Sequence, residues 1–349
     1  MRKKLRICMI GAGRVGKLHA GTLKRYIPDA DVVAIVDPVS ETLDETADEF
    51  GINLRFASLE EALDKAEFDA VIITTPTFTH RELTVLASGH GKHVFCEKPM
   101  ALTIEECDEM IASTEKNGVH LQIGFMRRFD PEFVHATQLI QEGAIGDIMQ
   151  IKSLTHGPGL PPMWANDISR SNGMIAEVNS HDLDCVRWMV GSDIQRIYVE
   201  TANFKGDARG VPYENFYDTM FASIRFESGA LGNVGGVCPC DYGYDARVEI
   251  IGTKGILQVG QMQSKAIVVC VDRDEGLITP MYKRWQERFA SAYVNEMEHF
   301  VECIQNDTTP RVSGIDGRWA VLAVLAGTKS FLETRPVYLS EVIEVLEDA

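Results

Sequence analysis

Short apolar runs alternate with amphipathic stretches along the first third of the chain. The amphipathic stretches have helical spacing, and two of them begin with a capping pattern, Ser58 with Glu61 and Thr103 with Glu106. The apolar runs predict strands at 5–10, 32–36, 70–73, 93–96 and 120–123. Strands that alternate with helices are typical of a parallel sheet covered on both faces. We therefore predict a doubly wound α/β domain over residues 1–124.

The pattern changes after Gly124, where apolar runs come in close succession. Further strands are predicted at 197–202, 219–226, 230–237, 247–251, 256–259 and 266–271. Helices are predicted at 131–142, 174–190, 284–305 and 317–334. Strands without helices between them favour an antiparallel or mixed sheet. We expect residues 125–349 to form an α+β domain with a mostly antiparallel sheet, which binds substrate and carries the oligomer contacts.

Composition and charge narrow the class of partner. The 349 residues are 45% hydrophobic and 24% charged, as in ordinary globular proteins, and their number favours two domains. A formal charge of −17 disfavours nucleic acid and anionic lipid surfaces, and no apolar run approaches the roughly 18 residues of a membrane span. The eight cysteines lack metal or redox spacing. We expect a soluble cytoplasmic protein with reduced thiols that acts on a small neutral ligand.

A glycine-rich turn follows the first predicted strand and opens a helix. It reads Gly11-Ala12-Gly13-Arg14-Val15-Gly16. In this context the first glycine permits a tight turn, the second lets backbone N–H groups approach a pyrophosphate, and the third lets helix and strand pack closely. The first turn of a helix also favours an anion. The turn therefore predicts a dinucleotide site of the Rossmann type, made by its glycines together with Arg14 and Val15.

Two further strand ends extend this predicted site. Asp37 ends the second strand, where a carboxylate can accept hydrogen bonds from the adenosine ribose and repels a 2′-phosphate. No Lys or Arg occurs at 38–41, so we expect NAD rather than NADP. Thr75 and Pro76 follow a later strand and can line the nicotinamide ribose. His80 opens the next helix, as a capping or packing residue or as a ligand contact.

The triplet Glu97-Lys98-Pro99 ends another strand on the same sheet edge. A residue before proline is held extended, so the Lys98 ammonium can point across the cofactor edge. The glycine turn, the Thr-Pro loop with His80 and this triplet resemble marks of the Gfo/Idh/MocA family, named for glucose-fructose oxidoreductase and inositol dehydrogenase. Segments 124–130, 242–245 and 288–293 resemble inositol 2-dehydrogenases more particularly, and the resemblance spans nearly the whole chain.

The resemblance implies oxidation of a secondary ring alcohol of a cyclitol or sugar to a ketone, with hydride transfer to NAD. The family's catalytic lysine falls on Lys98 and its catalytic histidine on His181. Glu97 and Arg127 are expected near the cofactor, although Arg127 can instead form ion pairs between domains. The polyol-binding positions of the family fall on His156, Asp184, Tyr242 and Tyr244. Trp164 can cover a sugar ring or simply pack.

The residues support this chemistry on their own terms. His181 has a side chain whose pKa ordinarily lies near neutral pH, which suits removal of the hydroxyl proton. Lys98 can stabilise the charge that develops on the oxygen. Glu177 stands four residues before His181, so within one helix both would project from one face, and the carboxylate can orient the imidazole. A metal site of Glu177, His181 and His156 is the alternative, but hydride transfer needs no metal and we expect none.

Two departures from the family pattern keep other functions open. Glu177 replaces the usual aspartate, and residues 235–240 read Gly-Gly-Val-Cys-Pro-Cys where inositol dehydrogenases tend to carry polar residues. The alternatives are a dehydrogenase of a hexose or glycoside, for example at C3, redox-assisted glycoside cleavage, and a non-catalytic NAD-sensing regulator. The retention of both Lys98 and His181 weighs against the regulator. A homodimer or homotetramer is expected, because a one-sided sheet commonly buries its open face by symmetric association.

Overall fold

The computed structural model describes residues 4–206, 209–213, 215–264, 269–270, 277–278 and 280–347. The chain forms two compact units. Unit 1 comprises Met1–Phe129 and Ser291–Val321, and unit 2 comprises Asp130–Ala290 and Leu322–Ala349. This division differs from the expected one after Gly124, because a late segment belongs with the first part of the chain. The last boundary, between Val321 and Leu322, falls within a long helix.

Unit 1 contains a six-stranded parallel sheet with the strand order β3-β2-β1-β4-β5-β6. The strands are β1 (Leu5–Ile10), β2 (Ala30–Val36), β3 (Leu54–Phe56), β4 (Ala70–Ile73), β5 (His93–Glu97) and β6 (Leu121–Gly124). In register, Ile10 at the end of β1 pairs with Val36 of β2 and with Ile73 of β4. The strands therefore end together, and the residues after them share one edge of the sheet. The predicted doubly wound fold is confirmed, and only the short β3 was missed.

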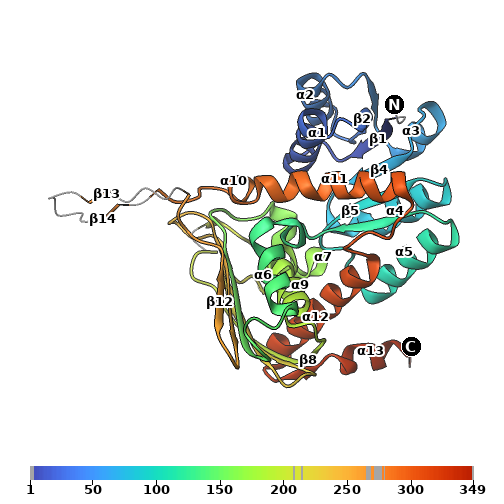
Figure 1. Cartoon of the computed structure of the whole chain (residues 1–349). Helices are drawn as coiled ribbons and strands as arrows, with labels where there is room; N and C mark the ends of the chain where they lie inside the picture. Colours follow the sequence, from blue (N-terminus) through green and yellow to red (C-terminus); the bar gives the residue numbers. More distant parts are fainter. Residues whose placement is uncertain are drawn as a thin grey trace. The chain divides into compact units, whose positions relative to one another are not determined.

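Helices connect the strands of unit 1 (Figure 1). They are α1 (Arg14–Tyr26), α2 (Ser40–Phe50), α3 (Leu59–Lys65), α4 (His80–Gly89) and α5 (Ile104–Lys116), with short 3₁₀ turns η1 (Thr77–Thr79) and η2 (Met126–Phe129). Both predicted caps are present. The Ser58 hydroxyl accepts from the Glu61 N–H at 3.3 Å, and Thr103 with Glu106 forms a reciprocal capping box.

A helix from the C-terminal half of the chain completes the core of unit 1. Helix α11 (Ala290–Asn306) places Met297, Phe300 and Val301 in the same buried cluster as Phe95 of β5. The Phe95 and Phe300 ring centroids lie 5.8 Å apart with the rings edge to face. The sequence predicted this helix as part of the second domain, but its apolar side covers the sheet of the first.

Unit 2 contains a seven-stranded mixed sheet with the order β12-β11-β7-β10-β9-β8-β15. Its strands are β7 (Ile148–His156), β8 (Ile194–Ala202), β9 (Thr219–Phe226), β10 (Leu231–Val237), β11 (Asp245–Gly252), β12 (Ile256–Val259) and β15 (Val337–Tyr338). Among the described strands of this sheet, only β7 and β10 pair in parallel. The mostly antiparallel sheet is confirmed, but the interior strand β7 and the short edge strand β15 were not predicted. The predicted strand 266–271 lies largely outside the described residues. Its described part, Val269–Cys270, forms β13 and pairs with β14 (Leu277–Ile278).

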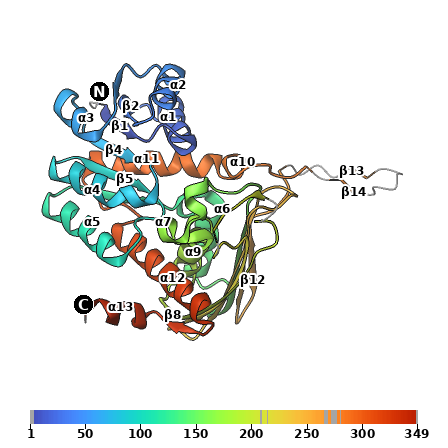
Figure 2. The ribbon, with the colours of Figure 1, turned by 180° about the vertical axis from the view of Figure 1, so that it is seen from behind.

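Helices cover one face of the unit 2 sheet (Figures 1 and 2). They include α6 (Pro131–Gln141), α9 (Ser180–Val190) and the later part of α12 (Gly314–Glu333); the others are η3 (Met163–Asn166), α7 (Ile168–Ser171), α8 (Gly173–Glu177), α10 (Trp285–Arg288) and α13 (Ser340–Glu347). The opposite face exposes Phe221 and Leu231, which are 59% and 52% accessible. Burial therefore alternates along β9, as expected for a sheet with one open face.

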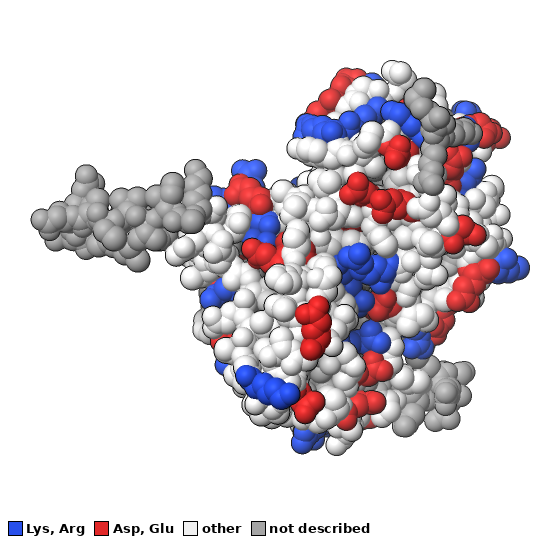
Figure 3. Space-filling view, viewed as in Figure 1, with Lys and Arg blue, Asp and Glu red and all other residues white. Residues whose placement is uncertain are grey.

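The described helices and surface charges add two findings. No helix among these residues is both long enough and apolar enough to cross a membrane. On the face of the molecule shown in Figure 3, the coloured Lys and Arg side chains are interspersed with Asp and Glu rather than gathered in one broad area.

Candidate active site

The three glycines of the nucleotide turn meet different constraints. A Cβ on Gly16 would lie 2.0 Å from the Gly11 carbonyl oxygen, so only glycine allows α1 to start this close to β1. Gly11 has a φ of +98°, and a Cβ there would lie 2.8 Å from Thr74 Oγ1. A Cβ on Gly13 would meet nothing within 4 Å. Gly13 therefore keeps open the approach to the helix, whereas Gly11 and Gly16 maintain its packing.

The start of α1 has the features of an anion site. Gly13 is the residue before the helix, so no side chain caps the N–H groups of the first turn. Gly13 and Arg14 are exposed and Val15 is half-buried. A helix of 13 residues favours a phosphate at its N-terminus. These residues fit the pyrophosphate of a dinucleotide.

Asp37 lies beside the same turn, at the end of β2. Its Oδ2 accepts from the Ala12 N–H at 2.8 Å and its Oδ1 from the Val39 N–H at 2.9 Å. The carboxylate is half-exposed and fixed by two backbone donors, which leaves lone pairs for further donors. This geometry suits the expected contact with ribose hydroxyls.

His80 connects two loops at the strand ends. Its side chain is 1% exposed, with Nε2 lying 2.9 Å from the Thr75 carbonyl oxygen and Nδ1 lying 2.9 Å from the Pro99 carbonyl oxygen. Burial lowers the pKa of His80, and the two carbonyl contacts act in the opposite direction. The histidine thus ties the loop of Thr75 and Pro76 to the residue after Lys98. Direct contact of His80 with the cofactor stays a prediction.

Lys98 follows β5 and is half-buried. The preceding carboxylate holds its backbone, because Glu97 Oε2 accepts from the Lys98 N–H at 3.1 Å. The other oxygen, Oε1, lies 2.7 Å from Nε2 of buried His19. Glu97, expected at the cofactor, is therefore 8% exposed and already engaged by the protein.

Two arginines follow β6 in unit 1. Arg127 is 1% exposed and lies in η2. Arg128 forms an ion pair with Asp316 at 3.1 Å, and both residues belong to unit 1. The expected contact of Arg127 with the cofactor stays a prediction.

In unit 2, His181 lies in the first turn of α9 and is 9% exposed. The next residue clamps this turn to the sheet. Asp182 accepts hydrogen bonds from the Ser153 and Thr155 hydroxyls of β7 at 2.5 Å and 2.7 Å, and from the Asn179 amide at 2.9 Å. This clamp was not predicted from the sequence, although the two-residue spacing of Ser153 and Thr155 on one strand face was a possible signal.

The clamp also explains Gly236, one of the two glycines in segment 235–240. A Cβ on Gly236 would lie 2.2 Å from Asn179 Oδ1, and the Asn179 amide donates to the Gly235 carbonyl at 3.3 Å. Glycine at 236 therefore lets the start of α9 pack directly against β10. This part of the departure from the family pattern serves packing beside His181.

The sequence predicted that Glu177 and His181 share one helix, but the structure places them on two. Helix α8 ends at Glu177, and α9 begins at Ser180 after the intervening Val178 and Asn179. The prediction that both side chains project from one helix face is therefore wrong. Any role of Glu177 depends on how the break between α8 and α9 directs its side chain. Within the described residues, no group of three or more His, Cys, Asp or Glu side chains is arranged to hold a metal.

Two of the expected polyol-binding residues lie together in unit 2. His156, at the end of β7, hydrogen-bonds through Nδ1 to the Tyr242 hydroxyl. That hydroxyl also donates to Asp245 Oδ2 at 3.3 Å, and Arg247 pairs with both oxygens of the buried Asp245. Burial lowers the pKa of His156, and burial with the charge of Asp245 raises the pKa of Tyr242. Tyr242 is 43% accessible, so the group presents hydroxyl and imidazole atoms to solvent.

The remaining expected substrate residues have different environments. Asp184 is 2% exposed, one turn after His181 on α9. Tyr244 is 5% exposed and packs edge to face on Phe289, with ring centroids 6.2 Å apart. Trp164 is half-buried in η3.

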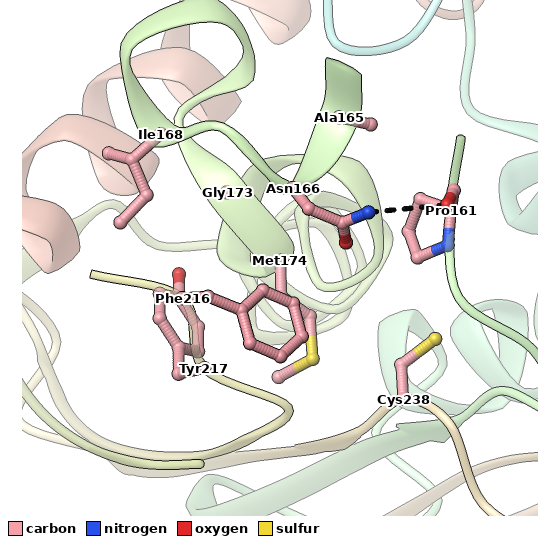
Figure 4. Close-up of a pocket in the computed structure, with 9 residues that line it drawn as sticks. All are labelled: Pro161, Ala165, Asn166, Ile168, Gly173, Met174, Phe216, Tyr217 and Cys238. Atoms are coloured by element: carbon pink, nitrogen blue, oxygen red, sulfur yellow. Dashed lines mark hydrogen bonds between the residues drawn. The ribbon is translucent and has the colours of Figure 1, made fainter. Parts of the chain in front are cut away.

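A small cavity in unit 2 is lined in part by Pro161, Asn166 and Met174. It has a volume of about 10 Å³, which is the space of roughly one water molecule. Figure 4 shows the Asn166 amide directed at Pro161, with Tyr217 and Cys238 on the cavity wall. A cyclitol ring is far larger than this space.

Comparison with known proteins identifies the family. Residues 5–125 match the model of the GFO/IDH/MocA oxidoreductase family with an NAD-binding Rossmann fold, and residues 133–258 match the GFO/IDH/MocA C-terminal domain. The chain is 34% identical over 342 residues to the scyllo-inositol 2-dehydrogenase (NAD(+)) of Bacillus subtilis, covering 97% of both. It is 32% identical over 339 residues to the myo-inositol 2-dehydrogenase of Thermotoga maritima, covering 97% of this chain and 100% of the relative.

Solved structures agree with these matches. The crystal structure of scyllo-inositol dehydrogenase from Lactobacillus casei with bound NAD(H) and scyllo-inositol is 30% identical, with a TM-score of 0.88. The alignment covers 97% of this chain and all of that one. The matched domains and the geometry of the nucleotide turn agree that NAD is the cofactor. The chain belongs to the Gfo/Idh/MocA family of NAD-dependent oxidoreductases.

Proposed function

We propose that this enzyme oxidises a secondary ring hydroxyl of a cyclitol, of the myo- or scyllo-inositol type, to a ketone. Relatives named inositol dehydrogenases align over nearly the whole chain, which supports this substrate class. The observation that carries the proposal is local. Lys98 and His181, the two positions that match the family's catalytic pair, each adjoin a buried carboxylate that anchors them to the fold.

The reaction divides into a proton transfer and a hydride transfer. His181 accepts the proton of the hydroxyl, because an imidazole can exchange a proton near neutral pH. Lys98 stabilises the oxygen as it gains negative charge and becomes a carbonyl. When bound, NAD accepts the hydride from the ring carbon. The products are a ketone, NADH and one proton, so atoms and electrons balance.

The proposed substrate contacts are polar groups in unit 2. The His156 and Tyr242 pair offers both hydrogen-bond donors and acceptors, which suits a ring with several hydroxyls. The other proposed contacts are Trp164, Asp184 and Tyr244. Glu177 is proposed to relay or orient through the break between α8 and α9, where its extra methylene compared with aspartate lengthens its reach.

The test is NADH formation with NAD and a panel of inositols, hexoses and glycosides, followed by absorbance. We expect NADH with at least one inositol. Lys98→Met removes the proposed oxygen stabiliser and should lower kcat about 100-fold or more without loss of NAD binding. Lys92→Met is the matched control, because Lys92 is half-buried just before the opposite end of the same strand and should leave kcat within about twofold.

Other results would point to the alternative functions. NADH only with a hexose or glycoside would replace the cyclitol by those substrates, which the Gly-Gly-Val-Cys-Pro-Cys segment at 235–240 keeps in view. Sugar release without net NADH would favour redox-assisted cleavage. NAD binding without turnover of any panel member would favour an NAD-sensing regulator. The expected homodimer or homotetramer stays a prediction.

A further inference from the structure

A buried polar cluster lies in unit 1 directly behind Lys98. We call it the carboxylate cluster; its members come from α1, β5, β6 and α11, and they are His19, Glu97, Gln122, Tyr293 and Glu296. His19, Gln122 and Glu296 are 0% exposed, Tyr293 is 6% and Glu97 is 8% exposed. Two carboxyl groups and a histidine in such a position are unusual, since charged residues are rarely buried without partners.

The sheet register explains how the cluster forms. Phe95 and Glu97 lie two residues apart on β5 and therefore face the same side of the sheet. Phe95 pairs with Gln122 of β6, and Glu97 pairs with Gly124. A Cβ on Gly124 would lie 3.0 Å from Cδ and Oε2 of Glu97, so glycine makes room for that carboxylate. Helix α11 then covers this side of the sheet.

Glu97 is well supplied with hydrogen-bond donors, and Glu296 is not. Glu97 accepts from His19 at 2.7 Å and from the Lys98 N–H at 3.1 Å. The Gln122 amide donates to the backbone oxygen of Glu296 at 3.2 Å. Neither carboxyl oxygen of Glu296 accepts a hydrogen bond from the described residues. The His19 ring is wedged between Phe95 and Tyr293, with centroid distances of 5.3 Å and 5.7 Å.

The charge state of the cluster follows from this asymmetry. A charged carboxylate that is fully buried without donors is costly, and a second negative charge nearby adds to the cost. Burial, and then the negative charge of Glu97, raise the pKa of Glu296 well above its ordinary value. The titratable neighbours in the cluster are Glu97 on β5, His19 on α1 and Tyr293 on α11 itself, whereas β6 contributes the uncharged Gln122.

We propose that Glu296 is a positioning residue that stays protonated in the carboxylate cluster and thereby keeps Glu97 on the Lys98 backbone. With Glu296 neutral, Glu97 carries the only carboxylate charge in the cluster. Its two oxygens accept hydrogen bonds from His19 and from the Lys98 N–H. Loss of the proton from Glu296 would add a second negative charge that Glu97 feels. Glu97 would then be displaced, and its hold on Lys98 would weaken. The inference rests on the proposed role of Lys98.

The first test detects the proton without any turnover. The infrared spectrum of the NAD-bound enzyme at pH 7 is compared with that of Glu296→Gln, which has nearly the same shape and cannot ionise. We expect the wild-type spectrum to contain a C=O stretch of a neutral carboxylic acid that the variant lacks. Glu302→Gln is the control, because Glu302 is exposed on the same helix and should remove only a carboxylate band. A carboxylate band lost in Glu296→Gln as well would overturn the proposal.

Stability gives a second readout that is independent of activity. A group whose pKa is raised on folding contributes stability that is complete below its unfolded pKa of about 4.3 and is lost as pH rises. The unfolding equilibrium constant of the wild type, divided by that of Glu296→Gln, should therefore rise about tenfold per pH unit above that value. A ratio independent of pH would contradict a protonated Glu296.

Kinetics test the effect on Lys98. At pH 7, Glu296→Gln and Glu296→Leu both remove the ionisable group, so each should keep kcat within about threefold with little change in the KM for NAD. On the alkaline side the wild type should lose kcat earlier than Glu296→Gln. Identical pH profiles of the wild type and Glu296→Gln would contradict positioning. Absence of wild-type turnover would instead reject the proposed function. The infrared spectra would still show whether Glu296 is protonated.

Discussion

In unit 1 the proposed reactive side chain, Lys98, follows a strand of a parallel sheet, whereas in unit 2 His181 lies in the first turn of a helix on a mixed sheet. A buried carboxylate adjoins each of them in sequence, Glu97 before the lysine and Asp182 after the histidine. Asp182 accepts from three neutral donors. Glu97 instead shares its charge with a histidine and stands near a second acid.

The difference has a physical consequence. Three uncharged donors make the Asp182 clamp a fixed, well-satisfied anchor that adds stability. The Glu97 anchor depends on the protonation of Glu296, because both carboxyl groups and His19 are buried in the same cluster. The histidine side should therefore respond to substitution mainly through stability, and the lysine side mainly through charge and pH.

The largest expected effect comes from removing the Asp182 anchor. Asp182→Ala leaves the Ser153, Thr155 and Asn179 donors without their acceptor and should cost about 3 kcal/mol in the free energy of unfolding. Urea unfolding measures this loss. Asp193→Ala, which breaks a partly exposed ion pair with Arg187, is the control and should cost less than about 1 kcal/mol. Equal losses would show that the clamp is not special.

The packing beneath the clamp should give the next effect. Gly236→Ala would force a methyl group against Asn179 and should destabilise the protein by about 2 kcal/mol. Gly235→Ala is the neighbouring control, since the nearest atoms to its Cβ, on Leu154 and Phe221, lie 3.8 Å and 3.9 Å away. Its effect should stay within about 0.5 kcal/mol. Similar unfolding midpoints for both variants would contradict the close approach of α9 to β10.

Neutralising Glu97 should affect rate more than stability. Glu97→Gln keeps the shape of the side chain but removes the charge, so kcat should fall about tenfold as the Lys98 anchor weakens. NAD affinity, measured by calorimetry, should change less than about twofold if Glu97 acts through Lys98. A matching loss of NAD affinity would favour the direct cofactor contact that the sequence predicted. Asp182→Asn makes the same change from carboxylate to amide beside His181 in unit 2, and its effect is compared with that of Glu97→Gln.

The smallest effect is expected at the adenosine end of unit 1. Asp37→Ser should weaken NAD binding about fivefold by removing a hydrogen-bonded carboxylate, and should improve NADP binding by removing a repulsive charge. The ratio of the two dissociation constants measures the change. Wild-type enzyme that binds NADP as tightly as NAD would contradict this role for Asp37.

The two units also differ in how far the sequence predicts them. The strands of unit 1 are buried on both faces and read as continuous apolar runs, as in β4 with all four residues buried. Strand β7 was missed because two of its buried positions are Ser153 and Thr155. Those hydroxyls donate hydrogen bonds to Asp182. The residues that form the clamp therefore interrupt the apolar pattern from which the strand could have been predicted.

Within the site, local motifs were predictable and long-range burial was not. The glycine turn and the carboxylate after β2 are short patterns with a direct structural meaning. Nothing near Glu296 in sequence distinguishes it from exposed acids such as Glu302 on the same helix, because its burial depends on where α11 packs. The break between Glu177 and His181 was equally hidden, since no glycine or proline separates α8 from α9.

Transfer of the ring hydrogen tests the central claim most directly. The enzyme is incubated with NAD and myo-inositol or scyllo-inositol that carries deuterium on every ring carbon, and the reduced nicotinamide is examined by mass spectrometry. The proposed reaction predicts one deuterium in each NADH formed, and almost no product from Lys98→Met. Unlabelled NADH, or no reduced nicotinamide while NAD remains bound, would contradict hydride transfer from the cyclitol ring.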